Sequence, residues 1–305
     1  MPLAQRITGR MTTPNEATLR SYTRSLKYQN RSQRTIDSYM ETARQLSDFN
    51  RNQNFEDMTR DDIESYLLAY AASHTPGGVA VRFRSLRALF GWMESEEIVE
   101  RSPMARMKQP FVPEVPIEVL TSAQLTRLLN VTEGKGFEQK RDRAILLVCL
   151  DAGLRVGELC GITMADLDMD QDLVYVTGKG RRPRSAPLGH NAGQSLDRYL
   201  RERARHPAAS KIDGLWIGSR NMAMTPSGIS QMLRRRGAEA GVPDLHPHKL
   251  RHTWAHLMKV NGIDEDSLMR LGGWKSRSMV SRYGASAGDQ RAREAHRQFS
   301  PGDRL

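Results

Sequence analysis

Residues 246–253 read His-Pro-His-Lys-Leu-Arg-His-Thr, and this stretch carries side chains suited to chemistry on a phosphate group. His248 and Arg251 are both phosphate ligands, and on a helix they would lie one turn apart on the same face. An indole and a phenol follow, Trp274 and Tyr283, nine residues apart. A tyrosine can attack phosphorus and conserve the energy of the broken bond in its own phosphate ester. The stretch therefore predicts one half of a site that cuts a phosphodiester.

Cutting a phosphodiester without a metal also requires positive charge and a proton donor. Arginine neutralises the extra charge of a pentacoordinate phosphorane well, because its planar fork matches two non-bridging oxygens. A lysine held close can protonate the departing alkoxide. The free phenol has a pKa of about 10, so neighbouring groups must help to remove its proton. Upstream of the stretch, the chain supplies Arg155 and Lys179 for these tasks.

Four fragments of the chain resemble the motif set of the tyrosine recombinases, the phage integrase and Xer group. Each fragment is weak alone, but together they come in the family's order at its usual separations. They are Ala-Gly-Leu-Arg-Val-Gly-Glu-Leu at 152–159, Thr-Gly-Lys-Gly at 177–180, His-Lys-Leu-Arg-His at 248–252, and Leu-Gly-Gly-Trp at 271–274 followed by Tyr283. The resemblance covers residues 117–290, and residues 16–108 resemble the family's core-binding domain more loosely.

The resemblance implies a role for each reactive side chain. Arg155 and Arg251 would clamp the scissile phosphate. His248 would hydrogen-bond that phosphate and help to deprotonate the nucleophile. Lys179 would protonate the departing 5′ oxygen, and Tyr283 would form a 3′-phosphotyrosyl link.

Two further residues would support this chemistry. By the same resemblance, Glu158 follows Arg155 by three residues, one helical turn. The same resemblance implies that Glu158 orients the active-site arginines. Trp274 stands where most members of the family have a second histidine. An indole N–H can donate to a phosphate oxygen but cannot shuttle protons. We therefore assign Trp274 to positioning.

The resemblance also implies partners. The family holds double-stranded DNA between its two domains, brings a homo-tetramer to two DNA sites and exchanges strands through a Holliday junction. No nucleotide cofactor is implied, because the covalent ester conserves the energy. We expect no metal either. About 15 residues precede the first helical region, too few for a separate arm-binding domain. This favours a simple integrase of a phage or mobile element acting on a short core site; the sequence identifies no accessory protein.

The elements that position these residues predict a mainly α-helical fold with a small antiparallel β-sheet in the catalytic domain. Residues 1–15 form a polar tail, and the periodicity of residues 16–108 predicts a small helical bundle, which the resemblance implies is SAM-like. Residues 109–117 hold three prolines and predict an extended linker. Residues 118–305 would then be a mixed α+β tyrosine-recombinase catalytic domain.

Apolar spacing and capping residues predict the individual elements. In the first domain the expected helices cover 32–49, 59–70 and 79–93, with a chain break at 74–78. In the second domain they cover 121–129, 141–150, 196–203, 229–240, a helix starting at Pro247 and another after Asp264. A hairpin is expected from strands 173–176 and 181–188. A last short helix would begin at Ser276 or Ser278 and end near Tyr283.

Clusters of arginine mark candidate DNA contacts. Arg82, Arg84 and Arg87 flank the apolar stripe of the third helix, where they could reach phosphates or guanine edges. A solvated helix face is the equally weighted alternative. Residues 234–236 are also three arginines, and here the solvated face is slightly favoured.

The predicted hairpin has a basic tip as well. Arg181, Arg182 and Arg184 follow its turn and are candidate DNA contacts. A simple exposed turn that uses glycine for its backbone angles is the alternative.

Bulk composition limits the classes of partner. The net charge of +11 favours a polyanion, either nucleic acid or an anionic membrane. The longest apolar run, 144–150, is too short to span a bilayer, and the N-terminus lacks a signal-peptide core. The two cysteines can build neither a disulfide framework nor a cysteine-based zinc cluster. We therefore expect DNA rather than a membrane as partner, and the bacterial host cytosol as location.

Several alternatives remain open at this stage. His248, His252 and His256 are spaced by four residues and, with His246, could bind a metal, but no cysteine or carboxylate stands nearby in sequence. A non-catalytic DNA-binding regulator on the same fold would need no reactive residues. A type IB topoisomerase shares the chemistry. An Xer-like resolvase or a transposon recombinase shares the motifs as well.

Overall fold

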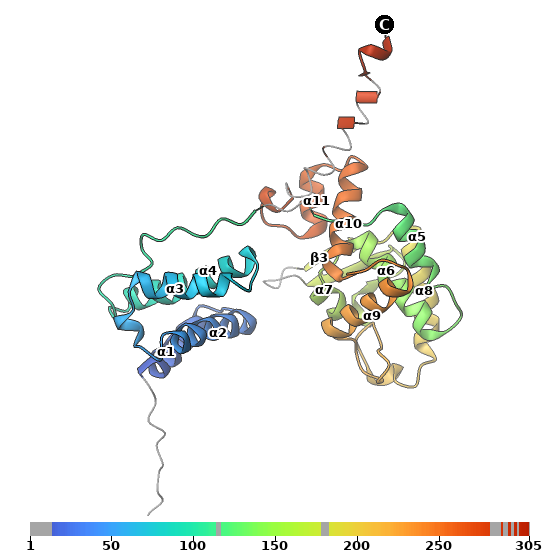
Figure 1. Ribbon diagram of the computed structural model, residues 1–305. Coiled ribbons are helices and arrows are strands. Elements are labelled where there is room, and N and C mark those ends of the chain that lie inside the picture. Colours follow the sequence, from blue (N-terminus) through green and yellow to red (C-terminus); the bar gives the residue numbers. More distant parts are fainter. Residues whose placement is uncertain are drawn as a thin grey trace, which may run out of the picture. The chain divides into compact units, whose positions relative to one another are not determined.

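The computed structural model describes residues 14–113, 117–177, 183–280, 288, 292–293, 296–297 and 299–304 (Figure 1). The chain divides into two compact units, residues 1–115 and 116–305. Each unit has its own hydrophobic core. Within the described residues, no helix combines the length and the apolar character that crossing a membrane requires.

Four α-helices make up the described part of the N-terminal unit. They are α1 (Pro14–Tyr28), α2 (Gln33–Phe49), α3 (Arg60–Ala71) and α4 (Pro76–Ser95). Helix α2 packs against both α1 and α4, and the large side chains Phe83, Leu86 and Phe90 of α4 are fully buried. The expected bundle is therefore present, together with α1, which the sequence analysis had not singled out as a helix.

The start of α4 corrects the chain break that we expected at 74–78. The Thr75 hydroxyl accepts a hydrogen bond from the Gly78 amide at 3.3 Å and caps the helix, and Pro76 occupies its first turn. Proline suits this position because the first amides of a helix need no intrahelical partner. The two glycines after Pro76 thus belong to the helix, and only 72–75 separate it from α3.

The described part of the C-terminal unit combines helices with one sheet. The helices are α5 (Ser122–Asn130), α6 (Phe137–Ala152), α7 (Val156–Gly161), α8 (His190–Ala204), α9 (Pro226–Glu239), α10 (Pro247–Val260) and α11 (Glu265–Gly272). Helix α6 packs against both α8 and α10. Residues 277–280 are helical again, after which the description stops until residue 288.

The sheet of this unit is antiparallel, in the order β1 (Leu167–Asp168), β2 (Leu173–Thr177), β3 (Pro183–Pro187). Thr177 pairs with Pro183, so β2 and β3 are the two arms of the expected hairpin. Its tip, 178–182, lies outside the described residues. Strand β1 was not expected from the sequence; it adds a short third strand beside β2.

The end of α6 explains a glycine that lies two residues before Arg155. Gly153 adopts the left-handed conformation, with φ of 55°, and closes α6. A Cβ at this position would overlap the ring of Trp254, which is fully buried on α10. Glycine therefore allows α6 to end directly against α10, which brings Arg155 close to the helix that carries His248 and Arg251.

One arginine of the 234–236 run corrects the expected solvated face. Arg236 is buried and donates through Nε to the Asp142 carboxylate at 2.9 Å, and through Nη1 to Glu239 at 2.8 Å. Arg141 donates to the same buried carboxylate at 2.7 Å. These arginines neutralise a carboxylate inside the unit, so Arg236 cannot be part of a solvated face.

Candidate active site

The C-terminal end of α11 gathers three arginines. Three successive backbone carbonyls there each accept a hydrogen bond from one guanidinium group. They are the carbonyl of Leu271 for Arg184, that of Gly272 for Arg251 and that of Gly273 for Arg155, the last at 2.9 Å. The final carbonyls of a helix lack intrahelical donors and form the negative end of its dipole, so they attract cations. This helix end thus fixes side chains that come from three different elements.

Glu158 joins two of these arginines from the other side. Its carboxylate accepts from Arg155 Nη1 at 2.7 Å and from the Arg155 amide at 2.9 Å. Arg184 Nη2 donates to the same carboxylate at 3.0 Å. Burial raises the pKa of Glu158, but hydrogen bonds from Arg155 and the charges of both arginines outweigh this and hold the pKa below its usual range. The carboxylate, only 4% exposed, is therefore ionised and braces both guanidinium groups.

Arg155 itself stands at the N-cap of α7, where Glu158 bonds back to its amide as in a capping box. Its side chain remains 31% exposed. A guanidinium group has five N–H donors, and Glu158 and Gly273 account for two of its nitrogens on one side. Arg155 is thus both fixed and accessible to an anion from solvent.

Arg251 is more deeply placed. Only 4% of this residue is exposed, and its other Nη donates to the carbonyl of Gly153. Its guanidinium carbon lies 4.5 Å from the centre of the Trp274 ring, which in turn stacks on Trp254 at 5.7 Å. A Cβ on Gly272 would overlap the Trp274 indole, so the backbone approaches this ring closely. Trp274 therefore packs directly against the Arg251 guanidinium group.

His248 lies in the first turn of α10, and its side chain reaches solvent. The surrounding protein removes part of its hydration, and the charges of His246, Arg251 and Arg155 add to this, so the pKa of His248 is lowered. Both arginines thus act on this ring, although Arg155 comes from a different helix. An imidazole with a lowered pKa is neutral near pH 7 and can accept a proton.

The other histidines of the stretch have structural positions. His246 caps α10, its Nδ1 accepting from the Lys249 amide at 3.2 Å. Burial, followed by the charges of His248, His246 and Arg251, lowers the pKa of His252 to about 4. Across the described ranges, no three or more His, Cys, Asp and Glu side chains form a cluster that could hold a metal ion.

Four residues predicted for the site, Lys179, Arg181, Arg182 and Tyr283, lie outside the described residues. Of the described catalytic and supporting candidates, Arg155, Arg251 and Trp274 meet around the end of α11 together with Glu158, and the charges of both arginines act on His248. In sequence, this helix end lies ten residues before Tyr283, and the described helical residues 277–280 lead towards it.

Arg184 has a different environment from the exposed hairpin tip that the sequence suggested. It belongs to β3, its side chain is 12% exposed, and its hydrogen bonds go to Glu158 and to the carbonyl of Leu271. Sequence reasoning missed both this role and the carbonyls of 271–273. The signal that could have pointed to the carbonyls is the Gly-Gly pair, because glycine is frequent where a helix ends in the left-handed conformation.

The arginines of α4 are held more loosely. Arg82 donates to the Thr42 hydroxyl at 2.7 Å and lies 5.1 Å from the centre of the Tyr70 ring. Arg87 donates to the carbonyl of Met107. In the described part of the chain, Arg84 has neither a hydrogen bond nor an ion pair, and its side chain is exposed.

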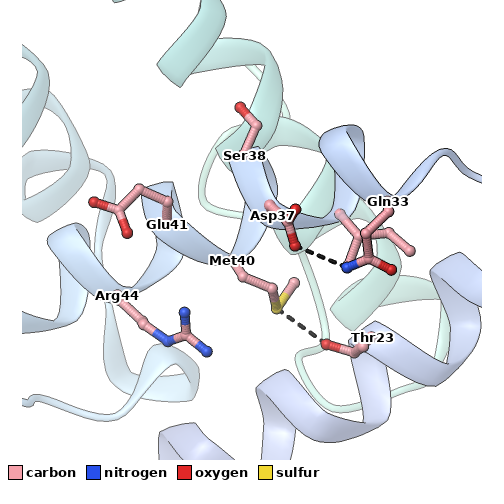
Figure 2. A pocket seen from close by; sticks show the side chains of 8 residues that line it. Thr23, Gln33, Asp37, Ser38, Met40, Glu41 and Arg44 are labelled. Carbon is pink, nitrogen blue, oxygen red and sulfur yellow. Dashed lines mark hydrogen bonds between the residues drawn. The ribbon is translucent and has the colours of Figure 1, made fainter. Parts of the chain in front are cut away.

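The N-terminal unit also has a groove of about 680 Å³ between α1 and α2 (Figure 2). Its polar side chains bind one another: Gln33 donates to Asp37 at 2.8 Å, and Thr23 lies 3.1 Å from the sulfur of Met40. The groove brings together no nucleophile with a base. The chemically distinctive cluster is therefore the one at the end of α11.

Comparisons with known proteins identify the family of the chain. Residues 118–289 match the phage integrase family, and residues 19–100 match the phage integrase N-terminal SAM-like domain. Tyrosine recombinase XerC of Roseiflexus sp. (strain RS-1) is 30% identical over 82% of this chain and 82% of its own. Tyrosine recombinase XerD of Listeria innocua is 28% identical over 93% of this chain and 92% of its own.

The fold has solved counterparts too. The Tn1549 transposon integrase, in complex with transposon right end DNA, superposes with a TM-score of 0.74 at 18% identity, over 93% of this chain and 99% of its own. At that identity the likeness concerns the fold, which is the expected helical SAM-like unit followed by a mixed α+β catalytic unit. The chain belongs to the phage integrase family and is a site-specific tyrosine recombinase.

Proposed function

We propose that this recombinase binds double-stranded DNA and breaks one strand by attack of Tyr283 on the scissile phosphate. The phenolic oxygen replaces the 5′ oxygen at phosphorus, leaving a 3′-phosphotyrosyl ester and a free 5′ hydroxyl. Lys179 gives the departing oxygen its proton, and His248 receives the proton of the phenol. The observation that carries the proposal is the pair Arg155 and Arg251, held by neighbouring carbonyls ten and eleven residues before the tyrosine.

The two arginines supply the charge that this reaction needs. Arg155 offers a fixed and partly exposed guanidinium group to a non-bridging oxygen. Arg251 holds its charge nearby, fixed against Trp274, without needing to reorganise when the phosphorane forms. Preorganised donors of this kind typically lower a reaction barrier by about 3–4 kcal/mol each.

The lowered pKa of His248 suits a proton acceptor. The ring is neutral near pH 7, so it can take the phenolic proton. A bound phosphate would bring negative charge to the same place and raise the pKa again, which stabilises the proton once it has been transferred. The arginines thus keep His248 neutral in the free protein, and a bound phosphate would make the ring a stronger base.

We further propose a division of labour between the parts of the chain. Residues 16–108 bind the core DNA site, with Arg82, Arg84 and Arg87 as contacts. Residues 118–305 cut and rejoin it, and residues 109–117 link the two. The DNA-bound Tn1549 integrase supports this choice of partner.

Strand exchange requires four active sites, so the assembly that we propose is a homo-tetramer on two DNA sites. Arg181 and Arg182, at the tip of the hairpin, would touch the DNA backbone. The biological role that we propose is integration and excision of a phage or mobile element. Resolution of chromosome multimers is the second candidate, favoured by the XerC and XerD relatives. Sequencing the recombinant joints formed in cells that carry the gene distinguishes them: joints between an element and a chromosome indicate integration.

A covalent-adduct assay tests the chemistry. Duplexes selected for binding from a random pool are nicked next to the cleavage position, so that the released strand diffuses away and the intermediate accumulates. The native protein should give a protein–DNA adduct that survives denaturant, and Tyr283→Phe should give none. Tyr28→Phe, at an exposed tyrosine of α1, is the matched control and should react normally. No adduct from the native protein would contradict the proposal, and an adduct from Tyr283→Phe would exclude this nucleophile.

A further inference from the structure

We propose that Arg184 is a positioning residue that acts through Glu158 on Arg155 and ties strand β3 to the end of α11. The inference rests on the proposed function, because it concerns the arginine that would bind the scissile phosphate. It replaces the direct DNA contact that the sequence suggested for Arg184.

The contacts of Arg184 all lie within the C-terminal unit. One Nη donates to the carbonyl of Leu271 and the other to the Glu158 carboxylate at 3.0 Å. The oxygen of Glu158 that it binds also accepts from the backbone amide of Arg155. Arg184 therefore holds the carboxylate that orients Arg155.

Within the described part of the chain, the buried position of Arg184 leaves one of its N–H donors without a hydrogen bond. Its Nε is buried and, among the described residues, has no hydrogen-bond partner. A buried N–H without a partner is destabilising by about 1–3 kcal/mol. A side chain selected only to bind DNA would have no reason to be buried in this way. The two bonds that it does make must therefore account for its position.

The backbone around Arg184 is shaped to let two guanidinium groups approach. Gly273 has φ of 60°, and a Cβ there would stand 3.2 Å from Arg184 Nε and 3.4 Å from Arg155 Nη1. Any side chain at this position would press on Arg184 Nε and touch Arg155 Nη1. The glycine thus serves the pair, which indicates that Arg184 and Arg155 are positioned together.

Only arginine can make this bridge. Its planar fork binds a carboxylate and a carbonyl at the same time, whereas a lysine ammonium is a single point charge. Without Arg184, Glu158 loses one of the hydrogen bonds that fix its rotamer. The Arg155 guanidinium group, which is bonded to Glu158, can then move together with this carboxylate. Arg184 also follows the hairpin tip by two residues. Its hydrogen bond to the carbonyl of Leu271 therefore connects the hairpin that carries Lys179 to α11, the helix that precedes Tyr283 in sequence.

The test compares Arg184→Lys and Arg184→Met with the native protein on the nicked duplex. Because a misplacement of about 1 Å can cost up to about 100-fold in rate, both variants should form the adduct about 10- to 100-fold more slowly at saturating DNA. The slope of DNA affinity against salt should stay unchanged in both. On a duplex with a neutral methylphosphonate at the scissile position, the defect should shrink, because less charge then has to be neutralised by Arg155.

Arg203→Met is the matched control. Arg203 is equally a buried arginine of this unit, and it donates to the carbonyls of Ile212, Gly214 and Leu215. Its loss should lower the thermal unfolding midpoint but leave the cleavage rate of folded protein near the native value. A cleavage defect in Arg203→Met as large as that of Arg184→Met would contradict a positioning role, since general loosening would then explain both.

Direct DNA contact gives a different pattern. If Arg184 touched a phosphate, Arg184→Met would reduce the salt slope by about one, and Arg184→Lys would retain the slope and most of the activity. That result would overturn the proposal. Failure of the proposed function is seen separately, as a native protein that forms no adduct or a Tyr283→Phe variant that does.

Discussion

Arg82 and Arg84 of the N-terminal unit are held less firmly than Arg155, Arg184 and Arg251 of the C-terminal unit. On α4, Arg84 is exposed, and Arg82 has one hydrogen bond to a hydroxyl and an aromatic ring beside it. In the C-terminal unit, Arg155, Arg184 and Arg251 are each fixed by a backbone carbonyl of α11 and by at least one further acceptor. Arg82 and Arg84 are thus less constrained than these three arginines, whereas Arg87 of α4 also donates to a backbone carbonyl, that of Met107.

This difference follows from what each set has to do. Arginines that meet phosphates along a duplex gain from long, adjustable stems, because their task is affinity and register. Arginines that stabilise a transition state must be in place beforehand, because reorganising them during the reaction would add to the barrier. The C-terminal unit achieves this with a helix end and one buried carboxylate, Glu158.

The largest expected effect is that of Arg155→Ala. Removing one fixed donor to the developing charge should slow adduct formation by about 10²- to 10³-fold. DNA affinity should change little, because the other phosphate contacts remain. Single-turnover cleavage and equilibrium binding, measured on the same duplex, test both statements. If weaker DNA binding accounted for all of the slower adduct formation, Arg155 would act like a DNA-binding arginine of α4, and the distinction between the arginines of the two units would be lost.

Glu158→Gln should have the next largest effect. The change removes the charge that braces two arginines, one of which is 31% exposed, so we expect it to be destabilising by about 1.5–3 kcal/mol, the range for hydrogen bonds to charged groups. Denaturant unfolding measures it. Glu64→Gln on α3 is the matched control: its pair with Arg60 is exposed, so its loss should lower the free energy of unfolding by at most about 1 kcal/mol. Equal effects would contradict a preorganised C-terminal site.

A smaller effect concerns His252. Its pKa is lowered to about 4 in the folded state, by burial and by the charges of His248, His246 and Arg251. The unfolded chain therefore binds a proton before the folded one does, and the free energy of unfolding should fall as pH drops from about 6.5 to about 4. Because the ring is partly exposed, the slope from this residue should stay below about 1.4 kcal/mol per pH unit. His252→Gln should remove that part of the slope, and an unchanged slope would show that other groups cause it.

Arg84→Ala should have the smallest effect. Losing one phosphate contact weakens DNA binding equally for all sequences and reduces the salt slope by about one. Cleavage at saturating DNA should be native-like. Titrations at several salt concentrations measure the slope. A native slope would mean that Arg84 belongs to a merely solvated helix face.

Much of the site was predictable because its residues occur in short fragments with fixed spacing. Arg155 with Glu158, and His248 with Arg251, lie one turn apart, and the helix and hairpin that carry them have clear periodicity. Trp274 was assigned to positioning on the properties of an indole, and it does pack against Arg251.

The rest had no signature in residue types. The α11 carbonyls belong to the backbone, so only the fold reveals that three arginines converge on them. Arg184 is part of an Arg-Arg-Pro-Arg run that reads as an exposed tip, because its partner Glu158 lies 26 residues upstream. Arg236 was misread for the same reason: its carboxylate partner, Asp142, lies 94 residues away.

The central claim is that the C-terminal arginines are fixed before DNA binds, and guanidinium NMR on the DNA-free protein tests it most directly. Order parameters of the Nε–H groups report motion on the picosecond to nanosecond scale. Arg155, Arg184 and Arg251 should give values near the rigid backbone, about 0.85, and Arg84 should give a value below about 0.6. Equally low values for all four would contradict the account, because the site would then be assembled only by its substrate.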